Sequence, residues 1–136
     1  MNVPNQRIVY LNGEFVPESE AKIPFRDRGV KFGDAVFDTT RTFGHEIFRL
    51  REHLERFYRS LKYLRIDAGM TIEEFIAVTE HVVERNLPLI GKDEDYWVTQ
   101  RVTRGIDTAD RTHWPEWSTL CENVAVVGSF CWWRTR

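Results

Sequence analysis

The amino-acid sequence predicts an α+β fold with a largely antiparallel sheet and two packed helices. Stretches rich in Val, Ile, Phe and Thr lie before residue 50 and after residue 95, and the segment between them changes to the spacing of amphipathic helices. Asn12-Gly13, between two short apolar stretches, is the signature of a tight hairpin. Because strand-like and helical stretches are segregated along the chain and do not strictly alternate, the sheet should be mainly antiparallel.

The first predicted element is a hairpin. Residues 7–12 form one strand, and Glu14-Phe15-Val16 returns as its partner. Asn12 and Gly13 supply the two positive-φ positions of a type I′ turn. Pro17 ends the second strand because it has no N–H to donate.

Further strands are expected on both sides of the helical segment. Residues 35–43 form a long strand, which turns at Gly44-His45 into residues 46–50. A third short apolar piece at 23–25 leads into residues 27–29, which have loop composition. The other expected strands are residues 95–104 and 124–127, and a polar loop at 105–118 separates them.

Two helices are predicted between these strands. The first carries an apolar stripe at helical spacing, formed by Leu54, Phe57, Tyr58, Leu61 and Leu64. The second begins at Thr71, where Glu74 completes a capping box, and is stopped by Asn86 followed by Leu87-Pro88. The expected core comprises Ile8, Tyr10, Phe15, Val36, Leu54, Phe57, Leu61, Phe75, Ile76 and Val98.

Composition restricts the class of protein. A chain of 136 residues fits one domain, and a net charge of −2 argues against a nucleic-acid binder, which needs a concentrated basic face. No stretch approaches the roughly 20 apolar residues of a membrane span, and no signal peptide is seen. With only two cysteines, Cys121 and Cys131, the expectation is a cytoplasmic protein with reduced thiols. The histidines lack the spacing of a metal site, so no metal is expected.

The end of the chain has an unusual composition. Both cysteines and four of the five tryptophans lie after residue 112, and the chain stops soon after an apolar stretch. An uncovered apolar edge invites aggregation, so a covering element would normally follow. We therefore interpret residues 119–136 as a truncated or aberrant tail, and we expect the last dozen residues to pack poorly or to lie at a sheet edge.

Two segments carry a resemblance to a known family. They are Asp27-Arg28-Gly29-Val30-Lys31-Phe32-Gly33-Asp34-Ala35-Val36-Phe37-Asp38 and Phe48-Arg49-Leu50-Arg51-Glu52-His53-Leu54-Glu55-Arg56-Phe57. Their order and spacing, together with Val102-Thr103-Arg104-Gly105, resemble the class IV (fold type IV) pyridoxal-phosphate aminotransferases. These include the branched-chain, D-amino-acid and R-selective amine aminotransferases. The resemblance covers roughly residues 7–118.

The resemblance implies that residues 1–118 form the small N-terminal domain of a two-domain, homodimeric transaminase. Such an enzyme moves an amino group between an amino acid or amine and a 2-oxo acid, with pyridoxal 5′-phosphate as its cofactor. The large cofactor-binding domain, which carries the catalytic lysine, is expected to be absent. None of the chain's lysines matches that lysine: Lys22 is expected in an early strand, Lys31 in a loop, Lys62 on the first helix and Lys92 in a turn. The chain alone should therefore be inactive, with no catalytic residue of its own.

Arg56 stands at the position that in the family binds the cofactor phosphate. A guanidinium can present two parallel N–H donors to a phosphate. The other interpretation is a solvated charge, because Arg56 falls opposite the apolar stripe of its helix.

Four further residues are candidates for substrate binding. Phe32 and Phe37 stand where the family lines its substrate pocket with aromatic side chains, although both could equally be ordinary core residues. Arg111 and His113 resemble the pair with which the D-amino-acid enzymes bind the substrate carboxylate across the dimer. The alternative for Arg111 is a polar loop residue neutralised by nearby acids.

Three other functions remain open. The family also contains the lyase that splits aminodeoxychorismate, a different reaction on the same scaffold. The chain could be a non-catalytic pseudoenzyme that dimerises or binds a full-length relative, or the product of a truncated or frameshifted gene. The sequence does not separate D-amino acids, branched-chain L-amino acids and R-amines as substrates.

Overall fold

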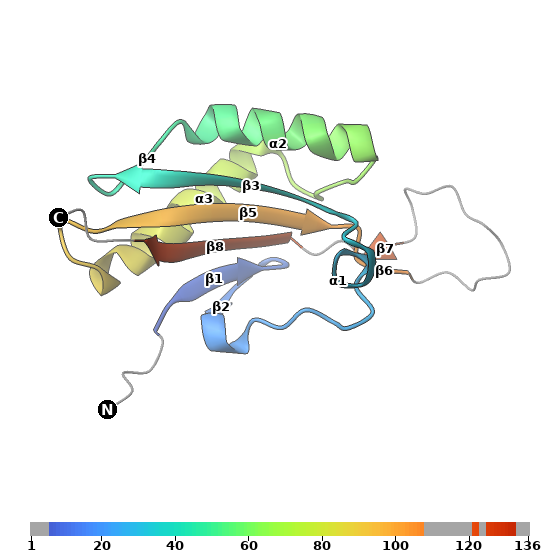
Figure 1. Cartoon of the computed structure of the whole chain (residues 1–136), viewed down its shortest axis with the longest axis horizontal. Coiled ribbons are helices and arrows are strands. Elements are labelled where there is room, and N and C mark those ends of the chain that lie inside the picture. Colours follow the sequence, from blue (N-terminus) through green and yellow to red (C-terminus); the bar gives the residue numbers. More distant parts are fainter. Residues whose placement is uncertain (1–5, 108–120, 123–124, 133–136) are drawn as a thin grey trace, which may run out of the picture.

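A six-stranded antiparallel sheet forms the framework of the protein in the computed structural model, which describes residues 6–107, 121–122 and 125–132 (Figure 1). The strand order is β2-β1-β8-β5-β3-β4. The strands are β1 (Ile8–Leu11), β2 (Glu14–Pro17), β3 (Ala35–Phe43), β4 (Glu46–Ile47), β5 (Asp95–Thr103) and β8 (Ala125–Trp132), and a separate two-stranded ribbon pairs β6 (Ile106–Asp107) with β7 (Cys121–Glu122). The predicted α+β class is confirmed.

The hairpin of β1 and β2 forms as predicted. Its register pairs Tyr10 with Phe15 and Leu11 with Glu14. Asn12 and Gly13 between the strands have φ values of 49° and 96°, the two positive values that a type I′ turn requires.

Two helices cover one side of the sheet. Helix α2 (Leu50–Leu64) lies over β3, and α3 (Ile72–Asn86) lies behind β8 and β1 (Figure 1). The capping box predicted at Thr71 and Glu74 is present, and α3 passes at its end into a short 3₁₀ helix, η2 (Leu87–Leu89). Another short 3₁₀ helix, η1 (Glu18–Glu20), follows the hairpin.

The central strands bury alternate residues, because successive side chains of a strand point to opposite faces. In β3 the side chains that face the helices are Val36, Asp38, Thr40 and Thr42, and in β5 they are Tyr96, Val98, Gln100 and Val102. The opposite face of these two strands is more exposed. Of the predicted core residues, Tyr10, Val36, Leu54, Phe57, Leu61, Phe75 and Val98 are buried, and Ile8, Phe15 and Ile76 are partly buried.

Three expectations about local structure are wrong. Residues 28–32 are not a loop, because they form a short helix, α1 (Arg28–Phe32), capped by Asp27. Lys22 does not lie in a strand. The edge position offered for the last dozen residues is wrong for β8, because β8 pairs with β1 on one side and with β5 on the other; the alternative of poor packing stays a prediction. Sequence reasoning missed this because only the partner strands, distant in the chain, show that β8 is internal.

Candidate functional site

The segment Asp27-Arg28-Gly29 forms a structural junction between α1 and the end of β5. Asp27 is fully buried and accepts hydrogen bonds from the Val30 amide (3.2 Å) and from the Thr103 hydroxyl (2.6 Å). A Cβ atom on Gly29 would lie 2.6 Å from the Thr103 methyl carbon, so only glycine fits this close approach. Gly33 ends the helix with a positive φ of 68°, which glycine adopts without strain.

Asp34 extends this junction to helix α2. Its carboxylate accepts hydrogen bonds from Arg28 (3.0 Å) and Arg104 (2.7 Å). Arg104 also donates to the carbonyl oxygens of Leu64 and Arg65, at 2.9 and 3.2 Å, where α2 ends. Burial would raise the pKa of Asp34, but the hydrogen bonds and charges of the two arginines outweigh it and hold the pKa below its usual value. These residues therefore hold elements together and present little to a ligand.

A second cluster lies where α2 passes over β3. Arg56 donates from Nε to Asp38 Oδ2 (2.8 Å) and from Nη2 to Asp38 Oδ1 (2.9 Å), which makes a bidentate pair. His53, one turn earlier on the same helix, has Nδ1 at 2.6 Å from Asp38 Oδ1. Because an ionised carboxylate only accepts hydrogen bonds, His53 Nδ1 carries the proton in this contact.

Burial and charge act against each other at Asp38. The side chain is only 4% exposed, and this burial alone would raise its pKa. The hydrogen bonds and charges of Arg56 and His53 outweigh the burial and hold the pKa of Asp38 below its usual value. Asp38 is therefore an ionised anchor beneath the arginine.

Arg56 is fixed on one edge and open on the other. Its side chain is 60% exposed although it pairs with a buried carboxylate. Among the described residues, Arg56 Nη1 has no hydrogen-bond partner, and a guanidinium has donors on more than one edge. The arrangement suits a phosphate or carboxylate bound from the outside. Asp38 gives the guanidinium a fixed position that the solvated-charge interpretation of Arg56 did not include, and the role of Arg56 as a phosphate ligand stays a prediction.

The strand beneath Arg56 has an open edge. Only Thr42 and Phe43 of β3 pair with β4, and the Arg41 carbonyl accepts from the Phe48 amide, so residues 35–40 have no neighbouring strand on that side within the described part of the chain. At this edge Arg56 lies on the helix-covered face of the sheet, and Phe37 points to the opposite face.

Phe37 lies on the exposed face of the sheet and not in the core. Its side chain is 65% exposed, and the Arg101 guanidinium lies 5.6 Å from the ring centroid. Next to them on the same face, the hydroxyls of Thr39 and Thr99 lie 3.1 Å apart. The core interpretation of Phe37 is wrong, and this face offers an aromatic ring, a guanidinium and two hydroxyls to a ligand.

Phe32 is exposed as well, at the end of α1. It is 63% exposed, with the Arg28 guanidinium 5.2 Å and the Lys31 ammonium 4.8 Å from its ring centroid. Phe25 and Val30 nearby in the chain are also exposed. The core interpretation of Phe32 is therefore wrong too, and the residues around α1 expose apolar side chains of the kind that partner surfaces cover.

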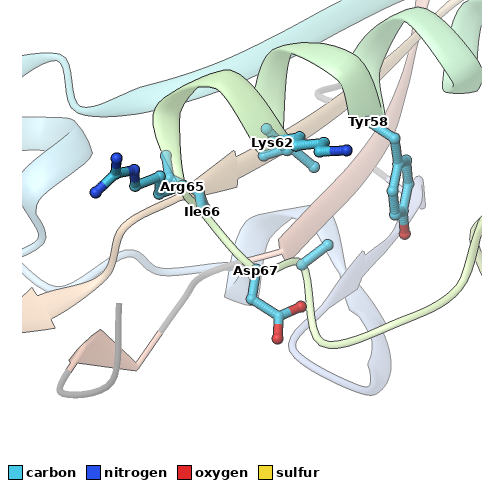
Figure 2. Close-up of a pocket in the computed structure, with 7 residues that line it drawn as sticks. Tyr58, Lys62, Arg65, Ile66 and Asp67 are labelled. Carbon is cyan, nitrogen blue, oxygen red and sulfur yellow. The ribbon is translucent and has the colours of Figure 1, made fainter. Parts of the chain in front are cut away.

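One pocket of about 520 Å³ lies at the C-terminal end of α2, and the predicted site residues that the structure describes, Phe32, Phe37 and Arg56, do not line it. Figure 2 shows Tyr58, Lys62, Arg65 and Asp67 around it. Tyr58 follows Arg56 by two residues, which at about 100° per residue places the two on different sides of the helix. Burial, followed by the charges of Asp67, Glu74 and Glu73, raises the pKa of Tyr58 to about 12, so the phenol stays protonated and donates to the Met70 carbonyl.

Gln100 is another buried polar residue near Asp38. Its side chain is fully buried, and neither its amide nitrogen nor its amide oxygen has a hydrogen-bond partner in the structure as described. Leaving such a group unsatisfied costs about 1–3 kcal/mol.

Sequence reasoning missed three residues of this region: Asp38, Gln100 and Arg101. The alternation of the strand at 35–43 could have indicated Asp38, because it places an acidic side chain among residues that face the core. Arg111 and His113 lie outside the described residues, so their proposed role stays a prediction. Within the described residues, no helix is long and apolar enough to span a membrane, and no group of three or more His, Cys, Asp or Glu side chains could hold a metal ion.

Comparison with known proteins places these observations in a family. The family model for amino-transferase class IV matches residues 35–120. The chain belongs to the class IV aminotransferases. This member is 36% identical over 105 residues to D-alanine aminotransferase of Staphylococcus haemolyticus, an alignment that covers 77% of this chain and 35% of that enzyme.

Solved class IV enzymes share the fold. The branched-chain aminotransferase of Thermoproteus uzoniensis, solved with norvaline, superposes with a TM-score of 0.73 at 25% identity, covering 91% of this chain and 40% of that one. The T.th. branched-chain amino acid aminotransferase, solved with N-(5′-phosphopyridoxyl)-L-glutamate, gives a TM-score of 0.76 at 27% identity, covering 93% and 41%. The chain therefore has the fold of the small N-terminal domain of these enzymes, as its sequence predicts. It spans about a third of the length of the curated relatives that it matches.

Proposed function

We propose that this chain is the small-domain part of a pyridoxal-phosphate-dependent transaminase, which moves an amino group between an amino acid or amine and a 2-oxo acid. The observation that carries the proposal is the guanidinium of Arg56, which Asp38 fixes on one edge while its other edge points outward beside the open edge of β3. A second domain that docks there would bring a cofactor phosphate against that free edge.

The residues of this chain fit the phosphate end of the cofactor. Arg56 has unused N–H donors, and phosphate prefers bidentate arginine contacts. Pyridoxal phosphate would supply the electron sink for the chemistry at the amino-bearing carbon. Arg56 would hold its phosphate, and Asp38 and His53 set where the guanidinium lies before the phosphate binds.

The chain offers no suitable lysine for the aldehyde end of the cofactor. All four lysines, Lys22, Lys31, Lys62 and Lys92, are exposed. A catalytic lysine needs a protected, convergent site to control its reactivity. In our proposal the lysine therefore comes from the large domain of a complete enzyme, and residues 1–136 alone do not turn over substrate.

The exposed face of β3 and β5 is the proposed substrate side. Phe32 and Phe37 would line the pocket, and Arg111 and His113 would bind the substrate carboxylate of an amino acid. The exposed apolar residues around α1 support a homodimer, since Phe25, Val30 and Phe32 would otherwise remain in water. We also place the protein in the cytoplasm. The same dimer surface would serve the other candidate, a non-catalytic module that pairs with a full-length relative.

Titration of the cofactor into a complete enzyme, in which this chain is joined to a matching large domain, tests the proposal. Arg56→Ala should weaken binding of pyridoxal phosphate by about 1.5–3 kcal/mol, the cost of losing a charged hydrogen-bond pair. The matched control is Arg59→Ala, one turn further along the exposed side of the same helix, which should have little effect. Pyridoxal, which has no phosphate, should bind both variants equally. Equal affinity of the two variants for pyridoxal phosphate would contradict the proposal.

A further inference from the structure

Gln100 is a buried side chain for which the fold provides no hydrogen bond. It is fully buried in β5, and both of its amide atoms are unsatisfied in the described part of the chain. Native proteins satisfy nearly all such atoms, because a buried polar group that loses water and gains no partner destabilises the fold. An apolar side chain of the same shape would avoid that cost, so the presence of a buried amide at position 100 indicates a role other than packing.

The position of Gln100 relates it to the Arg56 cluster. It stands directly opposite Asp38 in the β3–β5 ladder, and both side chains are buried on the side of the sheet that the helices cover. Side chains directly opposite each other have Cβ atoms about 4.5–5.5 Å apart. Rotation about its side-chain bonds would therefore bring the Gln100 amide within reach of the Asp38 carboxylate.

Asp38 depends on its present donors. Arg56 and His53 give it three hydrogen bonds, of which Arg56 supplies two. The Arg56 side chain is largely exposed, so an anion at its outer edge competes with Asp38 for the guanidinium. If Arg56 turned toward that anion, Asp38 would remain a buried negative charge with His53 alone, and a buried charge without enough partners is strongly unfavourable.

We propose that Gln100 is a positioning residue that donates to Asp38 when an anion draws Arg56 outward. Without an anion the amide stays unsatisfied. When Arg56 moves, the amide N–H group replaces it at the carboxylate, and this lowers the cost of releasing the arginine. The role in binding rests on the proposed function of Arg56 as a phosphate ligand, whereas the exchange of partners at Asp38 is a property of this chain alone.

A double-mutant cycle on the 136-residue chain tests the exchange. Met has nearly the shape of Gln but no amide, and Arg56→Ala imitates the departure of the arginine. We expect Gln100→Met to raise the urea midpoint of the wild-type chain and to lower it in the Arg56→Ala background, with a coupling on the order of tenfold in the unfolding equilibrium constant. Gln6→Met, at the chain's other glutamine, which is exposed, is the control and should leave both midpoints unchanged. An effect of the same sign in both backgrounds would overturn the proposal.

Titration with inorganic phosphate, followed by the NMR signal of the Arg56 Nε–H group, tests the role in binding. Gln100→Met should weaken the response several-fold, a loss that a purely structural glutamine would not cause. Unchanged affinity in this variant would refute the positioning role. If the wild-type chain shows no response at Arg56 while the midpoints still change in opposite directions, the partner exchange is supported and the phosphate function of Arg56 fails.

Discussion

Two arginine–aspartate pairs in this protein have almost the same contact distance and very different surroundings. Arg104 donates to Asp34 at 2.7 Å, and Arg56 donates to Asp38 at 2.8 Å. The Arg104 side chain is 10% exposed, and its other donors satisfy the carbonyls at the end of α2. The Arg56 side chain is 60% exposed, and its outer edge points away from the protein. The distance between arginine and carboxylate therefore does not distinguish a structural arginine from a binding one. What distinguishes them is whether the remaining N–H groups of the guanidinium bond to the protein or face the solvent.

The largest difference is expected in stability. Arg104→Ala leaves the half-buried Asp34 with Arg28 alone and frees two carbonyl oxygens, and breaking a buried pair in this way costs about 3–5 kcal/mol. Arg56→Ala also leaves a buried carboxylate, but His53 and, in our proposal, the Gln100 amide donate to Asp38, so we expect a smaller loss of about 1–2 kcal/mol. Urea unfolding of both variants measures the two losses.

The comparison fails if the two losses are equal. A large loss for Arg56→Ala would mean that Arg56 is chiefly a structural residue. Arg104→Lys gives a further control, since it keeps the charge but cannot reach Asp34 and the two carbonyls with one planar fork. We expect it to recover only part of the lost stability.

A substitution at Gly29 tests the close packing of the same junction, whereas the arginine variants test its ion pairs. Gly29→Ala places a methyl group 2.6 Å from the Thr103 methyl carbon, and Thr103 is fixed by its bond to the buried Asp27. Such overpacking typically costs about 1–3 kcal/mol. Gly44→Ala is a less direct control, because its φ of 57° adds backbone strain although nothing crowds its Cβ. If the urea midpoint of Gly29→Ala equals that of the wild type, the junction is packed less tightly than its distances indicate.

Acid should weaken both pairs. The pKa of Asp34 and the pKa of Asp38 are lowered in the folded protein, so each carboxylate stabilises the fold above the unfolded pKa of about 3.9. That contribution is lost as the pH falls through the lowered folded values. The free energy of unfolding should therefore fall below about pH 4, and Asp34→Asn and Asp38→Asn should each be less stable at pH 7 but lose less on acidification. An unchanged acid slope in either variant would contradict the corresponding pKa direction.

Local rules predicted most of the fold. The hairpin turn at Asn12-Gly13, the capping box at Thr71 and the stripe of α2 depend on residues close in sequence. All three are present, except that Leu64 of the predicted stripe is exposed. The internal position of β8 was not predictable in this way, because it depends on β1 and β5, which are far away in the chain.

The candidate site also combines features that residues close in sequence determine with features that depend on distant residues. The sequence placed Arg56 on an exposed helix side, but Asp38, which decides where the guanidinium points, comes from a strand 18 residues earlier. The exposure of Phe32 and Phe37 also depends on distant neighbours. An aromatic residue in a strand is compatible with either face until the helices show which face is covered.

The smallest effect should come from Phe37. Its side chain is 65% exposed, so Phe37→Ala should change the free energy of unfolding by no more than about 0.5 kcal/mol. Val36, its neighbour in β3, is buried among the helices, and Val36→Ala should cost on the order of 1–3 kcal/mol. Urea titration of the two variants would then show that a substitution on the buried face of β3 lowers the free energy of unfolding, whereas one on the exposed face does not. A loss above about 1 kcal/mol for Phe37→Ala would return the ring to a structural role. If Phe37→Ala leaves the free energy of unfolding unchanged, the fold does not need an aromatic side chain at this exposed position. The ring is then free to contact a substrate, as the proposed function requires.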